Sequence, residues 1–242
     1  MCDVETREVM LKNGELIKGT LVPIFPARFL LQTDEMCLEL SETDIQSLDG
    51  KDDFRNLLKF DSVLINKEVM IHYYDEDGSM VSLHKMEHVN TSDNILGKVK
   101  LLRTSSGGIT KEFEELFNQQ EYYDSFGNSL PITIEKRLEN GWEYSIELPV
   151  PVAPGEVYEL TIRDRWSHWA KFEDNRWHTR HYTGPTGESI YTLIFIFPER
   201  SQILSITPQP LRQFNFNGKP SVTWKRYMPA NESISFEVAY NL

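Results

Sequence analysis

Short runs in which apolar and polar residues alternate dominate this chain. In Trp142–Leu148 every even position is apolar and every odd position is polar. In Val157–Arg165 the even positions again carry most of the large apolar side chains, and the odd ones end in two arginines. A period of two is typical of a strand with one buried face. We therefore predict half-buried β-strands at both places.

Turn sequences separate these runs along the chain. Asn13-Gly14 lies between two apolar runs, Asp77-Gly78 lies between Val69–Tyr74 and Met80–His88, and Pro154-Gly155 precedes Val157. Asn-Gly and Asp-Gly are the dipeptides that tight hairpins favour. Further strands are expected at Ile95–Leu102, Glu121–Ser125, Pro131–Arg137, Ser189–Phe197, Ile203–Thr207, Ser221–Tyr227 and Ser233–Tyr240. The pattern predicts an all-β protein built as an antiparallel β-sandwich.

One segment has the period of a helix instead. Ile109, Phe113, Leu116 and Phe117 recur at the spacing of one helical face. A turn of helix is also expected after Ser41, where an acidic residue follows three positions on. We predict one or two short helices at most.

The first fifty residues form a unit of their own in this reading. The Asn13-Gly14 hairpin is followed by a strand pair, Arg28–Thr33 and Met36–Leu40. The phrase LKNGELIKGTL resembles the opening of Sm-like and SH3-like small barrels, which implies a small barrel over residues 1–50. Residues 51–66 mix charged and apolar side chains and are interpreted as a packed linker.

Residues 67–242 form the second unit, a β-sandwich region of one or two packed sandwiches. Its segments NTSDNILGKVKLL, YYDSFGNSLPITIE, WEYSIELPVPVAPGEVYELTIRDRW and IFIFPERSQILSITP resemble an uncharacterised bacterial Ig-like β-sandwich module. Modules of this kind look like recognition or regulatory parts of larger signalling or defence systems. The resemblance implies a fold, and it carries no catalytic motif.

The net charge, the apolar stretches and the cysteines limit which binding partners and which location are expected for the protein. The net charge is −12, a sign that repels nucleic acid and anionic lipid. No apolar stretch approaches the length of a membrane span, and no charged segment precedes an apolar run at the start. The only cysteines are Cys2 and Cys37, which we expect to be free thiols. These observations favour a cytoplasmic protein without a membrane partner.

Catalytic and metal chemistry find little support in the sequence. His178 and His181 would point to opposite faces of a strand, and no cysteine pair or HExxH motif accompanies them. His84 and His88 share one strand face, which favours packing beside acids on a neighbouring strand. No nucleophile elbow or phosphate-binding loop with its lysine is present. We expect no enzyme activity, no metal and no cofactor.

One segment concentrates cations and aromatic rings within this acidic chain. Arginine and tryptophan dominate binding hot spots, and their interleaving also suits stacking on a base. The alternative is structural, with some members in the core and the charged ones stacked over them as cation–π pairs. The candidate binding residues are Arg163, Arg165, Trp166, His168, Trp169, Arg176, Trp177, His178 and Arg180.

The sequence leaves three functions to consider, in decreasing order of support. The first is a non-enzymatic binding or adaptor protein that recognises another protein. The second is a nucleotide or single-stranded nucleic-acid binder, which uses this segment or the small barrel and which the net charge disfavours. The third is an enzyme, for which the sequence offers no converging acid, base and nucleophile.

Overall fold

The structure is a computed structural model that describes residues 6–24, 28–33, 36–52, 66–104, 109–183, 188–229 and 232–242. Strands dominate it, and one α-helix, α1 (Lys111–Asn118), occurs in these ranges. The strands form four sheets, and all their pairs are antiparallel except one. The prediction of an all-β protein is therefore confirmed.

The N-terminal sheet has five strands in the order β4-β3-β2-β1-β5. They are β1 (Thr6–Leu11), β2 (Leu16–Ile24), β3 (Arg28–Gln32), β4 (Cys37–Ser41) and β5 (Ile45–Leu48). Gly14 has a φ of 86° at the first hairpin, which explains why Asn-Gly is found there. A single 3-10 turn, Glu42–Asp44, joins β4 to β5, and Ser41 N donates to Asp44 Oδ2 over 2.7 Å. Of the predicted linker, residues 53–65 lie outside the described residues.

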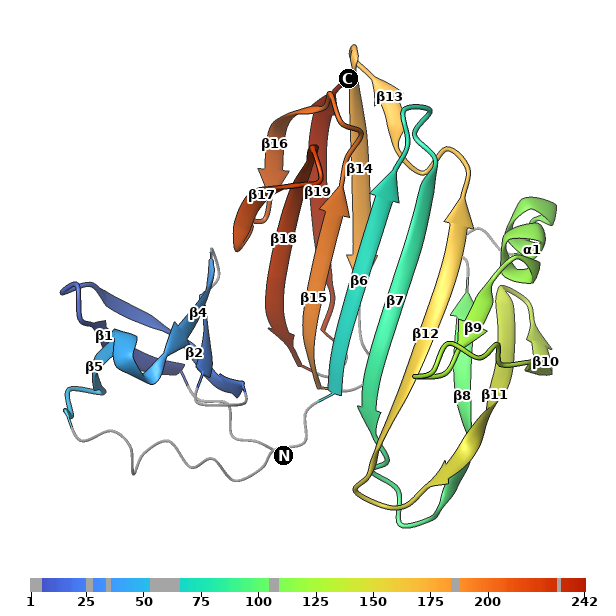
Figure 1. Cartoon of the computed structure of the whole chain (residues 1–242), viewed down its shortest axis with the longest axis horizontal. Helices are drawn as coiled ribbons and strands as arrows, with labels where there is room; N and C mark the ends of the chain where they lie inside the picture. Colours follow the sequence, from blue (N-terminus) through green and yellow to red (C-terminus); the bar gives the residue numbers. More distant parts are fainter. Residues whose placement is uncertain are drawn as a thin grey trace.

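The largest sheet has seven strands in the order β17-β18-β15-β6-β7-β12-β9 (Figure 1). Its members are β6 (Asn66–Tyr74), β7 (Met80–Val89), β9 (Glu121–Tyr123), β12 (Val157–Trp166), β15 (Ser189–Ile196), β17 (Arg212–Phe216) and β18 (Lys219–Met228). β6 and β15 form the parallel pair, although they are far apart in the sequence. The sheet thus brings early and late parts of the chain together at its centre.

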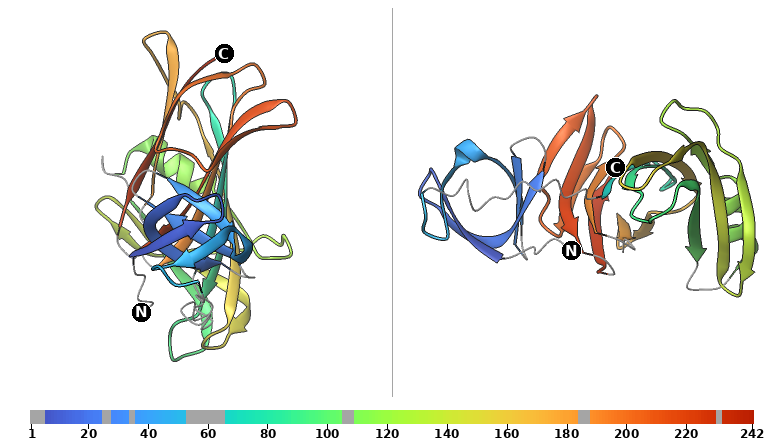
Figure 2. Two further views of the ribbon diagram at one scale, coloured as in Figure 1. Left: turned by 90° about the vertical axis from the view of Figure 1, so that its left-hand side faces the viewer. Right: turned by 90° about the horizontal axis from the view of Figure 1, so that it is seen from below.

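Two smaller sheets pack against this one (Figures 1 and 2). The first has the order β10-β11-β8, and the second has the order β13-β14-β19-β16. Their strands are β8 (Leu96–Thr104), β10 (Ile132–Leu138), β11 (Gly141–Val152), β13 (Lys171–Glu173), β14 (Arg176–Thr183), β16 (Gln202–Thr207) and β19 (Ile234–Asn241). The strands expected at Glu121–Ser125 and Pro131–Arg137 form as β9 and β10, but they join different sheets.

Both flanking sheets pack on the same face of the seven-stranded sheet. Tyr74 and Met80 are directly paired on β6 and β7 and belong to the core that contains Phe236 of the four-stranded sheet. The pair of Met86 and Leu160, on β7 and β12, belongs to a second core with the three-stranded sheet. Even-numbered residues of β6, β7 and β12 share one face, because directly paired residues point the same way. One large sheet therefore supports two separate hydrophobic cores.

The N-terminal sheet contacts the rest of the chain at β18. Val22, Leu30 and Cys37 form a small buried cluster with Ile190 and Tyr227. Lys225 Nζ lies 3.2 Å from Glu39 Oε2 beside this cluster. The contact combines buried apolar side chains with polar groups at its margin.

Candidate functional site: an aromatic trough

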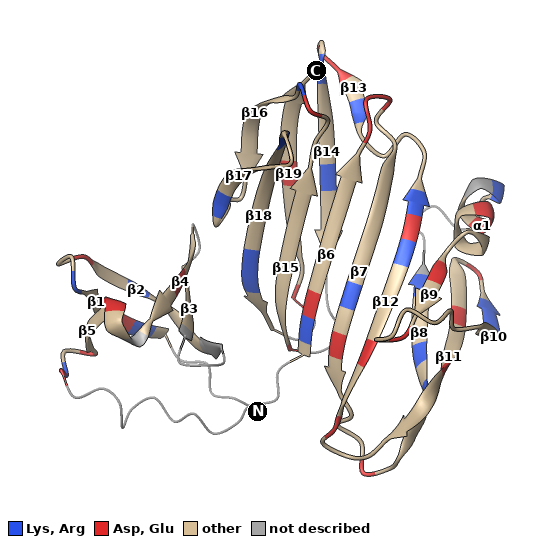
Figure 3. Ribbon diagram, in the orientation of Figure 1, with Lys and Arg blue, Asp and Glu red and all other residues tan. Residues whose placement is uncertain are grey.

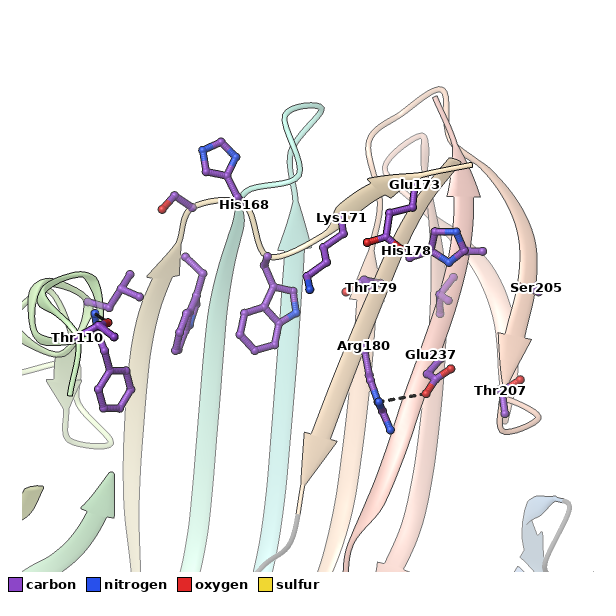
Figure 4. A pocket seen from close by; sticks show the side chains of 17 residues that line it. Thr110, His168, Lys171, Glu173, His178, Thr179, Arg180, Ser205, Thr207 and Glu237 are labelled. Carbon is purple, nitrogen blue, oxygen red and sulfur yellow. Dashed lines mark hydrogen bonds and ion pairs between the residues drawn. The ribbon is translucent and has the colours of Figure 1, made fainter. Parts of the chain in front are cut away.

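An open cavity of about 720 Å³ lies where α1 faces the four-stranded sheet (Figure 4). We call it the aromatic trough. One wall is α1, the loop 167–170 forms part of the lining, and the other wall is the four-stranded sheet. Its lining residues are Thr110, Phe113, Leu116, Trp166, Ser167, His168, Trp169, Lys171, Glu173, His178, Thr179, Arg180, Ser205, Thr207, Glu237, Val238 and Ala239.

The loop between β12 and β13 is held by the turn between β6 and β7. Ala170 N donates to the carbonyl oxygen of Gly78 over 2.9 Å. A Cβ on Gly78 would meet the Trp177 ring, and its φ of 78° also favours glycine. His168 has a φ of 54°, which reverses the chain within the loop. These contacts fix where the two tryptophans of the trough are placed.

A tight hairpin then returns the chain into the trough wall. Asp174 and Asn175, between β13 and β14, have φ values of 50° and 63°. Two successive residues with positive φ are the hallmark of a type I′ turn, which asparagine and aspartate tolerate best. Asp174-Asn175 is therefore a local sequence signal for this hairpin, although no hairpin was predicted here.

The helical wall forms as its sequence period predicted. Thr110 caps α1, because its side-chain oxygen accepts a hydrogen bond from Phe113 N over 3.1 Å. Phe117 stacks on Trp142 with ring centroids 4.6 Å apart, which ties the helix to the three-stranded sheet. Phe113 and Leu116 then line the trough. The apolar face of α1 thus packs on the core through Phe117 and forms one wall of the trough through Phe113 and Leu116.

Two tryptophans form the aromatic part of the lining. The rings of Trp166 and Trp169 meet edge to face with centroids 4.9 Å apart, and both are half-buried against the core. The Arg103 guanidinium lies 4.9 Å from the Trp166 ring centroid and 3.4 Å from Asp164. A cation–π pair therefore forms on Trp166, but its cation comes from β8, whereas the structural alternative expected a cation from the tryptophan segment itself.

The charged groups of the trough balance one another. Arg180 Nε lies 3.1 Å from Glu237 Oε1 and donates to Ser235 Oγ over 2.7 Å. Lys171 and Glu173 supply one further charge of each sign, and Figure 4 shows both beside His178. The trough is thus aromatic and polar, without an excess of either charge.

Five of the nine candidate residues line the trough: Trp166, His168, Trp169, His178 and Arg180. The other four lie elsewhere. Arg163 and Arg165 project from the opposite face of β12, where Arg163 pairs with Glu121 at 3.2 Å. Arg176 is exposed outside the lining, and Trp177 packs over Gly78. The segment therefore divides between two faces, as strand alternation requires.

Several lining residues had no local signal in the sequence. Ser205 and Thr207 come from β16 and Glu237 from β19, far along the chain from the tryptophans. They reach the trough only because β14, β19 and β16 are neighbours in one sheet. Nothing in their own segments distinguishes them from other exposed strand residues.

A second polar cluster lies on β6 and β7. The carboxylate of Glu68, on β6, accepts a hydrogen bond from His84 Nε2 over 3.0 Å and another from His88 Nε2 over 3.3 Å. Burial alone would raise the pKa of Glu68, but the hydrogen bonds from the two histidines outweigh it and hold the pKa at about 2. The shared strand face predicted this packing beside an acid. No group of three or more histidine, cysteine, aspartate or glutamate residues in the described ranges is arranged to hold a metal ion.

Two further histidines are buried between the sheets. The rings of His72 and His181 lie 4.8 Å apart, and His181 Nε2 is 2.8 Å from the Tyr191 hydroxyl. Burial lowers the pKa of His181 to about 3 and that of His72 well below its usual value. His178 is exposed, so it and His181 do point to opposite faces of β14.

Comparisons with known proteins identify no family, and the structural matches are weak. No family model matches the chain, and no curated protein matches it. Among solved structures, a mutant two-domain M1 zinc metallopeptidase bound to L-tryptophan matches with a TM-score of 0.43 and 12% identity, over 72% of this chain and 42% of that one. The M1 zinc metallopeptidase from Deinococcus radiodurans matches with a TM-score of 0.42 and 11% identity, over 72% and 40%. The chain thus spans less than half of these proteins.

No helix in the described ranges has both the length and the apolar character that crossing a membrane requires.

Proposed function

We propose that this chain is a non-enzymatic binding protein that recognises a segment of another protein in the aromatic trough. The observation that carries the proposal is the meeting of two half-buried tryptophans with α1 at one wall and a charged, hydroxyl-lined sheet at the other. Concave sites with an apolar floor and a few placed polar groups are where proteins bind ligands. Tryptophan and arginine are also the side chains that contribute most to protein interfaces.

The charge of the trough favours a protein over a nucleic acid. Lys171 and Arg180 are matched by Glu173 and Glu237 among the lining residues. In Figure 3 the basic positions of β12 are interspersed with acidic ones, within a chain of net charge −12. Nucleic-acid binding draws most of its free energy from neutralising phosphates, which requires an excess of cations.

We further propose that the five-stranded N-terminal sheet is a small barrel of the Sm-like or SH3-like kind, attached to a sandwich that carries the recognition site. The strand order β4-β3-β2-β1-β5 and the short helical turn before β5 support this assignment. A chain with this organisation suits a recognition component of a larger assembly.

A pull-down from native lysate, with and without nuclease, tests the proposal. We expect Trp169→Ala and Arg180→Ala to reduce capture of protein partners, because both side chains line the trough. The matched control is Arg165→Ala, which removes an exposed arginine from the opposite face of β12. Equal capture by all variants would refute the trough as the binding site, and capture that nuclease abolishes would favour the nucleic-acid alternative.

A further inference from the structure

One edge of β14 has no strand partner over most of its length. β14 pairs with β19 continuously from Trp177 to Thr183. On its other edge, β13 pairs only with the first three residues, from Arg176 to His178. No strand in the described part of the chain pairs with this edge from Thr179 to Thr183. Alternate residues along it therefore direct backbone N–H and C=O groups away from the sheet.

The first residues of the unpaired edge face the trough. Thr179 is only 3% exposed, yet it belongs to the trough lining, and Arg180 follows it there. Figure 4 shows Thr179 and Arg180 on β14, with Arg180 directed toward Glu237 and Thr110 at the start of α1 across the cavity. Unpaired backbone groups and an aromatic lining thus meet in one place.

From this juxtaposition we propose that the trough binds its ligand as an added β-strand, an extended peptide that pairs with Thr179–Thr183 beside β13. The inference rests on the proposed function and specifies how the ligand is held. Strand addition to an exposed edge is a common mode of peptide recognition, in which backbone hydrogen bonds supply affinity and alternate side chains supply specificity.

The lining indicates the chemistry of the peptide. Side chains of an added strand alternate between two faces, so every second one would reach Trp166 and Trp169. Apolar side chains fit these positions. Glu173 balances the charge of Lys171 within the lining, but Lys171 is exposed and no described residue lies within ion-pair distance of it. An acidic residue at an intervening position would supply the missing partner. The expected ligand therefore alternates apolar and acidic residues.

A synthetic octapeptide of alternating leucine and glutamate is the probe, used with the full chain. We expect saturable binding, followed by tryptophan fluorescence, and slower amide hydrogen exchange in residues 179–183 in the bound state. A peptide of the same composition in block order should bind at least about tenfold more weakly, because its apolar residues no longer share one face.

Backbone pairing is tested by methylating alternate amide nitrogens of the same peptide. Loss of those donors should weaken binding by at least about tenfold. Lys171→Glu should weaken binding as well, whereas Arg165→Glu, on the opposite face of β12, should leave it unchanged. Both positions are exposed, so neither change threatens folding.

The outcomes separate this inference from the proposed function. Strand addition is overturned if the methylated peptide binds as well as the unmethylated one, or if the alternating peptide does not bind. In either case, loss of lysate partners in Trp169→Ala would still support the trough as the binding site. Lysate partners that persist in Trp169→Ala and Arg180→Ala overturn the proposed function itself. Protection of residues 179–183 that rises with protein concentration, without peptide, would assign the edge to a second copy of the chain and also overturn the inference.

Discussion

The side chain of Gln32 makes both hydrogen bonds that a neighbouring strand would make to Tyr227. Tyr227 N donates to Gln32 Oε1 over 2.9 Å, and Gln32 Nε2 donates to the Tyr227 carbonyl oxygen over 3.2 Å. Tyr227 lies on β18 beyond the part that β17 covers. One amide from the N-terminal sheet therefore covers the open edge of the largest sheet.

Replacing Gln32 with glutamate should weaken this contact. The carboxylate cannot donate to the Tyr227 carbonyl, so we expect a loss of about 1–3 kcal/mol in the free energy of unfolding. Chemical denaturation followed by fluorescence measures it. Gln46→Glu, an exposed position on β5, is the control and should change stability by less than about 0.5 kcal/mol. Equal effects of the two changes would contradict the edge-covering role of Gln32.

Cys37 reports on the same interface. Burial raises the pKa of its thiol to about 12, so the reactive thiolate is scarce at neutral pH. In a Cys2→Ser background, we expect a thiol reagent at pH 8 to label Cys37 only when the interface opens. Adding Gln32→Glu should raise the labelling rate. Rapid labelling of the single-cysteine protein under native conditions would show that Cys37 is accessible, contrary to its 6% exposure.

Gly78→Ala should disturb the trough from a distance. The new methyl group would meet the Trp177 ring and lie 2.8 Å from the Ala170 carbonyl oxygen, at a φ that disfavours alanine. We expect a loss of stability of at least about 1–3 kcal/mol, with altered tryptophan fluorescence. Gly127→Ala has a similar φ of 83° and meets nothing within 4 Å. Because both glycines have a similar φ, any greater loss of stability at Gly78 measures the packing clash alone. Equal losses at the two positions would show that the contact with Trp177 does not matter.

Mild acid should destabilise the protein through its buried histidines. His181 and His72 have pKa values lowered by burial, so the unfolded chain takes up protons below about pH 6.5 that the folded chain does not. Stability should fall by about 1 kcal/mol per histidine between pH 7 and pH 5.5. His181→Gln should flatten this dependence, as measured by urea denaturation at several pH values. Exposed His178→Gln should leave the slope as it is.

Glu68 should act at lower pH. Its pKa of about 2 lies below that of an ordinary glutamate, so its stabilising effect is complete above about pH 4.5 and is lost as the pH falls toward 2. Glu68→Gln should cost about 1–3 kcal/mol at neutral pH and remove this part of the acid transition. Glu87→Gln affects a more exposed carboxylate and should cost less than about 1 kcal/mol. A similar cost for both would argue against the histidine-paired role of Glu68.

Local patterns predicted individual elements well, because the information for each lies within a few residues. Asn13-Gly14 and Asp77-Gly78 predicted hairpins whose glycines have φ values of 86° and 78°. The helical spacing around Phe113 predicted α1, and the alternation in Trp142–Leu148 predicted the buried face of β11. Strand pairing was harder to read. β9 pairs with β12, although more than thirty residues separate them in the sequence. The loop after β9 is a local feature: Asp124 accepts hydrogen bonds from Phe126 N and Asn128 N.

The sequence by itself determined the all-β class, most of the strands and the buried faces of the strands at Trp142–Leu148 and Val157–Arg165. It also marked the tryptophan-rich segment that contributes Trp166 and Trp169 to the trough. Only the tertiary structure decided which members of that segment share a surface, because strand alternation sends Arg163 and Arg165 to the opposite face. It alone brought α1 and Glu237 to the same cavity. Contacts between distant segments depend on sheet order, and no local pattern encodes that order.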